Sequence, residues 1–180
     1  MTTRLMTCLL GAAVLATAAC SVPITTPEQT LTVPYSTFVP NIANGVPLVT
    51  GLPPFADQAA PAVNFPTPAE AKKVKLESVM LHLRMRNTGP LPLRVTLYLT
   101  KHPDDPYATP PLGGAEGTLE VPGGGGQAEK AFPLDPALLQ NEQLRLGYKF
   151  GSPGTTESVT FKDTDKVEVS YKVSVAAKLF

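Results

Sequence analysis

Two histidines and two acidic turns are the residues of this sequence whose chemistry first suggests a site. His82 lies in an alternating segment, His102 opens His102-Pro103-Asp104-Asp105-Pro106, and a second acidic pair is Asp163-Thr164-Asp165. Imidazole and carboxylate groups can transfer protons or bind a divalent metal. The second pair lacks the glycine and the distant glutamate of a calcium loop, and aspartates in turns usually accept bonds from backbone amides. We therefore expect turns, no metal, no cofactor and no enzyme.

Two further groups of residues suggest binding rather than catalysis. The run Gly123–Gly126 resembles a phosphate cradle, but no GK[ST] follows it and no βαβ pattern surrounds it, so a strand connection is expected. Arg84, Arg86 and Arg94 are expected on one face of a hairpin. There they would contact anionic lipid head groups or an acidic partner, or form a solvated sheet face.

The elements that carry these residues alternate with a period of two. Apolar residues recur at every second position in 79–85 and again in 91–99, and Asn87-Thr88-Gly89-Pro90 lies between them. This pattern predicts a β-hairpin with one apolar face, with His82 beside Tyr98. Val74 and Leu76 are out of phase with the residues that follow, which predicts a bulge near Glu77-Ser78.

The pattern continues to the C-terminus. Residues 119–121, 128–132, 144–150, 159–161 and 167–179 alternate in the same way, and Asp135-Pro136 predicts one helical turn that Asn141 ends in a left-handed conformation. Seven to eight short strands with glycine and proline turns predict an all-β fold, an antiparallel β-sandwich of immunoglobulin-like or jelly-roll type. The cysteines and tryptophan of antibody domains are absent, so only the architecture is predicted.

Charge and cysteine content exclude several classes of protein. The chain has 180 residues with 15 basic and 15 acidic side chains, so nothing in its charge favours nucleic acid. Its two cysteines, Cys8 and Cys20, both lie near the N-terminus. The body therefore contains neither a disulfide nor a CxxC zinc or redox motif.

The first 19 residues have the order of an export signal. Arg4 precedes an apolar run over 9–15, and small residues follow. The apolar run is shorter than the roughly 20 residues that a membrane-spanning helix needs. We expect residues 1–19 to be removed; cleavage at Ala16-Thr17-Ala18 would give a plain secreted protein.

Thr17-Ala18-Ala19-Cys20 resembles the lipobox of bacterial lipoproteins, although Thr17 stands where an aliphatic residue is usual. The resemblance implies that Cys20 becomes the first residue of the mature chain and carries a diacylglyceryl group. Several acyl chains make such an anchor effectively permanent. By the sorting habit of that family, Ser21 favours the outer membrane where two membranes exist.

Residues 20–71 are rich in proline and predict an extended, lipid-anchored tether in front of a domain at 72–180. The segment is nevertheless apolar, so it needs cover. It packs either on its own domain, with Thr30–Tyr35 as an edge strand, or on a partner.

These observations predict a lipid-anchored protein of the cell envelope that acts as a non-enzymatic structural or protein-binding module, with another envelope protein or surface complex as partner. The alternative is a carrier or sensor for an apolar or glycan ligand, held between the sheets or at the strand ends. That alternative predicts an internal cavity lined by Met80, Phe132, Tyr148 and Phe161. A hydrolase is a third hypothesis, which the scarcity of histidines and nucleophiles disfavours.

Overall fold

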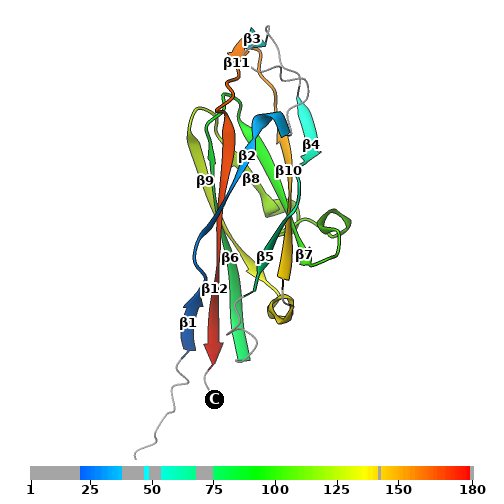
Figure 1. The fold of residues 1–180 in the computed structure, drawn as a ribbon, viewed down its shortest axis with the longest axis vertical. Helices are drawn as coiled ribbons and strands as arrows, with labels where there is room; N and C mark the ends of the chain where they lie inside the picture. Colours follow the sequence, from blue (N-terminus) through cyan, green and yellow to red (C-terminus); the bar gives the residue numbers. More distant parts are fainter. Residues whose placement is uncertain (1–20, 38–46, 49–53, 68–74, 142, 179–180) are drawn as a thin grey trace, which may run out of the picture.

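The computed structural model describes residues 21–37, 47–48, 54–67, 75–141 and 143–178. Two five-stranded antiparallel sheets face each other, and a two-stranded sheet lies at one end (Figure 1). The prediction of an all-β antiparallel sandwich is therefore confirmed. Among the described residues, no helix is long and apolar enough to cross a membrane. The predicted leader and Cys20 lie outside the described residues.

The first sheet is built on its longest strands. In order it contains β9 (Gly126–Leu134), β6 (Lys75–Asn87) and β12 (Lys166–Lys178). The free side of β12 is covered by two short strands placed end to end, β1 (Ser21–Thr25) and β2 (Gln29–Pro34). Thr26 continues the pairing between them, because its Oγ1 accepts the Val173 N–H at 2.9 Å.

The second sheet has the same number of strands. β10 (Gln143–Ser152) pairs on one side with β4 (Phe55–Ala59) and β5 (Val63–Pro66), and on the other with β7 (Leu93–Lys101). β8 (Thr118–Val121) completes the sheet beyond β7. The short strands β3 (Pro47–Leu48) and β11 (Val159–Thr160) pair at the end of the molecule opposite the C-terminus (Figure 1).

The segment predicted as a tether contributes strands to both sheets. The expected edge strand within Thr30–Tyr35 is β2, and Val33 and Tyr35 are 5% and 2% exposed. The sandwich therefore does not begin at residue 72, because β1, β2, β4 and β5 precede that position. The apolar residues of this segment needed cover, and Ile24, Leu31, Val33, Tyr35, Phe55 and Val63 find it on the core of their own domain.

The predicted hairpin is wrong. β6 pairs with β9 and β12 in the first sheet, whereas β7 pairs with β8 and β10 in the second. Residues 88–92 therefore carry the chain from one sheet to the other. Alternation shows which side of a strand is buried, but the pattern is the same for a hairpin and for a corner between two sheets.

Asn87 fixes this corner with a buried polar network. Its amide nitrogen donates to the Leu91 carbonyl at 2.6 Å, and its Oδ1 accepts from the Tyr35 hydroxyl at 2.6 Å and from the Gly89 N–H at 3.1 Å. A Cβ at Gly89 would come within 2.3 Å of the Tyr35 ring. Burial raises the pKa of the Tyr35 hydroxyl well above its usual value, so Tyr35 stays a neutral donor.

The glycine run forms the neighbouring turn, as predicted. Gly124 and Gly125 have positive φ values of 68° and 92°, which glycine adopts without strain. Their N–H groups donate to the carbonyls of Gly89 and Asn87 at 2.8 and 2.7 Å. The run therefore closes the end of the sandwich.

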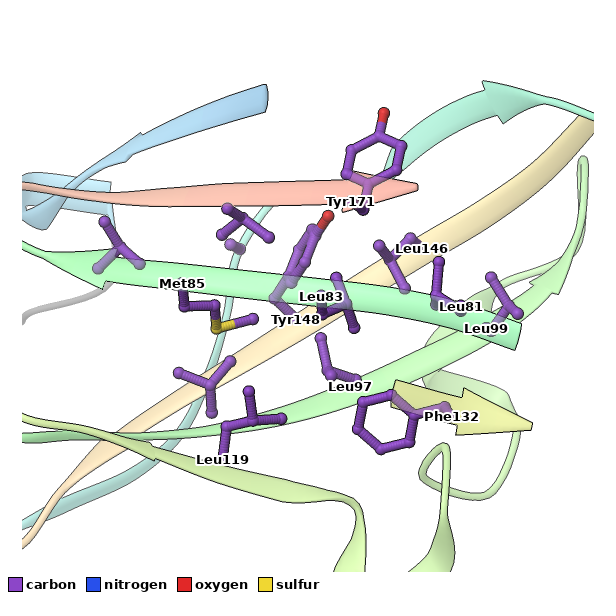
Figure 2. Close-up of a cluster of buried hydrophobic side chains, with 14 of the residues drawn as sticks. Leu81, Leu83, Met85, Leu97, Leu99, Leu119, Phe132, Leu146, Tyr148 and Tyr171 are labelled. Carbon is purple, nitrogen blue, oxygen red and sulfur yellow. The ribbon is translucent and has the colours of Figure 1, made fainter. Parts of the chain in front are cut away.

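Apolar side chains from the two sheets fill the space between them (Figure 2). Leu81, Leu83 and Met85 of β6 are at most 2% exposed. The predicted bulge is confirmed, because Ala176 pairs with Ser78 and Ala177 with Leu76, which leaves Glu77 as the extra residue. The extra residue lets the segments before and after it, which are out of phase in the sequence, turn their apolar residues to the same side of the strand.

The predicted helical turn is the 3-10 helix η5 (Pro136–Gln140). Asp135 caps it, as expected, by accepting the Ala137 N–H at 2.9 Å. Asn141 differs from the prediction, because its backbone is extended (φ −82°, ψ 153°) rather than left-handed. It leads almost directly into β10, and an extended residue continues into a strand. Its side chain still ends the turn by donating to the Leu138 carbonyl at 2.9 Å.

Candidate functional site

The outer side of the first sheet is a polar surface, which we call the open face. Alternation directs every second residue of β6, β12 and β9 away from the core. Its members are Ser78, Met80, His82, Arg84 and Arg86 of β6, Glu168, Ser170, Lys172, Ser174 and Ala176 of β12, and Gln127, Glu129, Ala131 and Pro133 of β9.

The register places these residues in rows across three strands. His82 lies between Lys172 and Ala131, and Arg84 lies between Ser170 and Glu129. A hollow of about 320 Å³ opens over these two rows. Its lining consists of Glu28, His82, Leu83, Arg84, Glu129, Lys130, Ala131, Ser170, Tyr171 and Lys172.

Arg84 joins β6 to the N-terminal segment across β12. Its guanidinium donates to Glu28 Oε1 at 2.6 Å, and the two side chains are 52% and 40% exposed. In the same row, the hydroxyls of Thr30 and Ser170 are 2.9 Å apart. Exposed pairs of this kind stabilise a fold by at most about 1 kcal/mol, so their main effect is to orient the groups.

His82 does not lie beside Tyr98, because their strands belong to different sheets. Its Nε2 is 2.7 Å from the Ser174 hydroxyl on β12. A serine and a histidine in contact are two of the three parts of a nucleophilic site. Among the described residues, no hydrogen-bond partner orients the other ring nitrogen, so the pair lacks the third part.

Two charged side chains that line the hollow, one on each strand beside β6, form no ion pair among the described residues. Lys172 and Glu129 are both exposed, and neither has an ion-pair partner within the described part of the chain. They lie on strands to either side of β6. Both groups are therefore available to a ligand.

The predicted basic stripe is divided between two faces. Arg84 and Arg86 belong to the open face, where Arg86 is 3.9 Å from Glu168. Arg94 lies on the outside of the second sheet, opposite Glu120 in the register, with its guanidinium 3.4 Å from that carboxylate. The prediction of one stripe was wrong because it assumed that β6 and β7 pair.

The outside of the second sheet, which we call the covered face, is partly covered by the loop 102–112. Pro106–Ala108 forms the 3-10 helix η3, and its Tyr107 hydroxyl donates to the Ala60 carbonyl and accepts the Tyr148 N–H at 3.2 Å. The Lys149 ammonium lies 5.0 Å from the Tyr98 ring centre and 5.7 Å from that of Tyr107. Tyr98, at an outward position, is only 8% exposed.

The acidic turns hold the backbone, as expected. Asp105 accepts the Tyr107 N–H at 3.0 Å, and the buried Asp165 accepts the Lys162 N–H at 2.8 Å. Asp104 lies 3.9 Å from the Lys101 ammonium. Within the described residues, no three His, Cys, Asp or Glu side chains come together as a metal site would require.

The four residues proposed to line an internal cavity do not all lie in the interior. Phe132, Tyr148 and Phe161 are at most 1% exposed and belong to the core, whereas Met80 is half-buried on the open face. Phe132 and Tyr148 lie among the packed side chains of Figure 2. Other hollows, of about 570 and 340 Å³, lie on the surface on either side of Arg94.

Sequence reasoning placed His82 and Arg84 correctly on a polar face but missed their neighbours. Lys172 and Glu129 also stood at polar positions of alternating segments, so their outward direction was readable. Their proximity depends on the strand order β12–β6–β9, which alternation does not encode. Glu28 was not predicted as a neighbour of Arg84, because it lies in the segment interpreted as a tether.

No family model matches the chain, and no curated protein matches it. Among solved structures it is similar to desmodium yellow mottle tymovirus, with a TM-score of 0.29, 10% identity, and coverage of 99% of this chain and 97% of that one. It is also similar to turnip yellow mosaic virus, with a TM-score of 0.26, 13% identity, and coverage of 100% of this chain and 90% of that one. For the Gx strain of infectious bursal disease virus the TM-score is 0.28 and the identity 11%, with coverage of 86% of this chain and 33% of that one. Similarities this low carry no argument about function.

Proposed function

We propose that this chain is an exported, lipid-anchored protein of the cell envelope that acts as a non-enzymatic accessory module. Cys20 is the lipidated residue, and the outer membrane is the favoured location where there are two membranes. The observation that carries the proposal is the export signal that ends in Thr17-Ala18-Ala19-Cys20. Balanced charge gives no reason to add nucleic acid as a partner.

The start of the fold is compatible with such an anchor. Ser21, the residue after Cys20, already pairs with Lys178 at the end of β12. A lipid on Cys20 would therefore hold this end of the sandwich near the bilayer without a spacer. The paired strands β3 and β11, at the opposite end, would then lie farthest from the membrane (Figure 1).

The open face is the surface through which such a module would dock onto another envelope component, either a protein or a surface complex. It is long, polar and free of covering segments from the described part of the chain, whereas loop 102–112 lies over the other sheet. Within the described ranges, neither face brings together the base, nucleophile and orienting group of a hydrolase.

A second candidate is supported by one specific observation. The chain would be a carrier or sensor for a glycan ligand, and the hollow over His82 and Arg84 is a surface site of suitable polarity. No such observation favours an apolar ligand between the sheets among the described residues.

Intact-mass spectrometry of the protein from its own cells tests the anchor. We expect a chain that begins at Cys20 with the added mass of a diacylglyceryl group, and we expect Cys20→Ala to release the protein into the soluble fraction. Cys8→Ala is the matched control and leaves membrane attachment unchanged. A soluble native product with an unmodified Cys20 thiol would refute the proposal.

A photo-crosslinking residue at position 172 of the open face tests docking, with position 120 on the second sheet as control. Both positions are exposed on strands. We expect a discrete adduct from position 172 that is absent from position 120. Identical products from both positions would contradict a role for the open face.

A further inference from the structure

We propose that the hollow on the open face binds a neutral polyhydroxylated ligand, one or two sugar units of a glycan. This inference rests on the second candidate function and names its ligand class. It does not depend on the lipid anchor, since the groups concerned belong to β6, β9, β12 and the β1–β2 connection.

The mixed charge of the hollow selects the ligand class. Three cations line it, Arg84, Lys130 and Lys172, together with the two carboxylates Glu28 and Glu129. An anionic ligand that reached Lys172 and Arg84 would also meet these carboxylates, and a cation would meet the opposite conflict. A hydroxyl group donates to carboxylates and accepts from ammonium and guanidinium groups, so a neutral polyol can satisfy both.

The shape of the hollow follows from small side chains beside larger ones. Ala131 and Ser170 are outward residues on the strands that flank β6, next to His82 and Arg84 respectively. They leave space over the sheet, and its volume of about 320 Å³ lies at the lower end of the range for ligand sites. This space suits a ligand of one or two rings.

Several of the polar groups are already held in position. Arg84 is fixed by Glu28 and His82 by Ser174. Ordering these side chains therefore costs little when a ligand binds. Lys172 and Glu129, on the strands to either side of β6, would then contact the ligand from both sides. Because the contacts are polar and exposed to water, we expect a dissociation constant on the order of 1 mM.

The test is a titration of the full processed protein, labelled with ¹⁵N and isolated in detergent from its own cells. The probe is N,N′-diacetylchitobiose, and glucuronate and glucosamine serve as the anionic and cationic sugars. We expect saturable amide shifts confined to residues around the hollow. Glu129→Ala and Lys172→Ala should each weaken binding by about fivefold to tenfold, as the loss of one hydrogen bond predicts.

The double variant Arg94→Ala with Glu120→Ala is the matched control, because it removes an exposed cross-strand pair from the other sheet. It should bind the disaccharide like the unmodified protein. Three outcomes would overturn the inference: no saturation with the neutral sugar, tighter binding of a charged sugar, or shifts that neither open-face substitution reduces. The mass spectrum that tests the anchor is unaffected by any of them.

Discussion

The two outer faces of the sandwich are built from similar alternating strands, yet they meet different surroundings. On the open face most of the outward residues are polar or charged, and all of them are exposed or half-buried. On the covered face, Gly147 and Tyr98 hold outward positions and are buried, because Tyr107 and its loop lie against the sheet. The comparison indicates that the covered face stabilises the fold, whereas the open face keeps its outward residues accessible to solvent.

The largest expected effect comes from filling the space under Tyr107. A Cβ at Gly147 would lie 2.9 Å from Tyr107 Cε1 and 3.0 Å from Pro106 Cγ, so Gly147→Val must displace the loop. We expect the free energy of unfolding to fall by about 2–4 kcal/mol. Urea denaturation measures it. Ala131→Val, at an exposed small residue of the open face, is the control and should change stability by less than about 0.5 kcal/mol. Equal losses would erase the distinction between the faces.

Tyr107→Phe should have the next largest effect. It keeps the ring but leaves the Ala60 carbonyl and the Tyr148 N–H without the hydroxyl that joins them. The expected loss is about 1–2 kcal/mol in the free energy of unfolding, measured by denaturant titration. Tyr98→Phe is the control, since no hydrogen bond of the Tyr98 hydroxyl occurs among the described residues. If Tyr107→Phe leaves the free energy of unfolding unchanged, packing alone holds the loop.

Alkaline pH should weaken the covered face as well. Burial raises the pKa of the Tyr107 hydroxyl above its ordinary value of 10.0. Below that value both folded and unfolded chains keep the proton; above it the unfolded chain loses the proton first, so stability falls as pH rises. Between about pH 9 and pH 11, the free energy of unfolding should therefore decline less steeply with pH in Tyr107→Phe than in the unmodified chain. Parallel slopes would contradict this assignment.

The smallest effect is expected on the open face. Arg84→Ala removes the ion pair with Glu28, but the two side chains are 52% and 40% exposed, and we expect a loss of less than about 1 kcal/mol. A double-mutant cycle with Glu28→Ala isolates the pair, and added salt should reduce its coupling energy. A coupling energy as large as the loss from Gly147→Val would show that this face is structural too.

The strands themselves were predictable from sequence. The alternation of Leu81, Leu83 and Met85 with polar residues predicted a half-buried strand, and the phase change at Glu77 predicted its bulge. The corner at Asn87 was not predictable, because it depends on the Tyr35 hydroxyl, which comes from a distant and proline-rich segment. Proline content there suggested a tether, whereas the strands β1 and β2 pair with the free side of β12.

The candidate site was predictable only in part. His82 and Arg84 were expected to be polar and outward, which they are. Tyr98 was also expected to be outward. It does hold an outward position, but it is buried because the loop that carries Tyr107 covers it. Local periodicity reports the two sides of a strand, but the neighbours across a sheet and the segments above it are set by long-range contacts.

The end-to-end pairing of β1 and β2 along β12 has a mechanical consequence. Ladder hydrogen bonds between antiparallel strands run perpendicular to the strand direction. A force that draws Ser21 away along the axis of β1 therefore acts on the bonds of the pairing Ser21–Thr25 with Ser174–Lys178 in shear, all at once. A sideways force would break the same bonds one by one. The pairing of β1 with β12 should therefore resist tension along the strands better than a sideways force that peels β1 away.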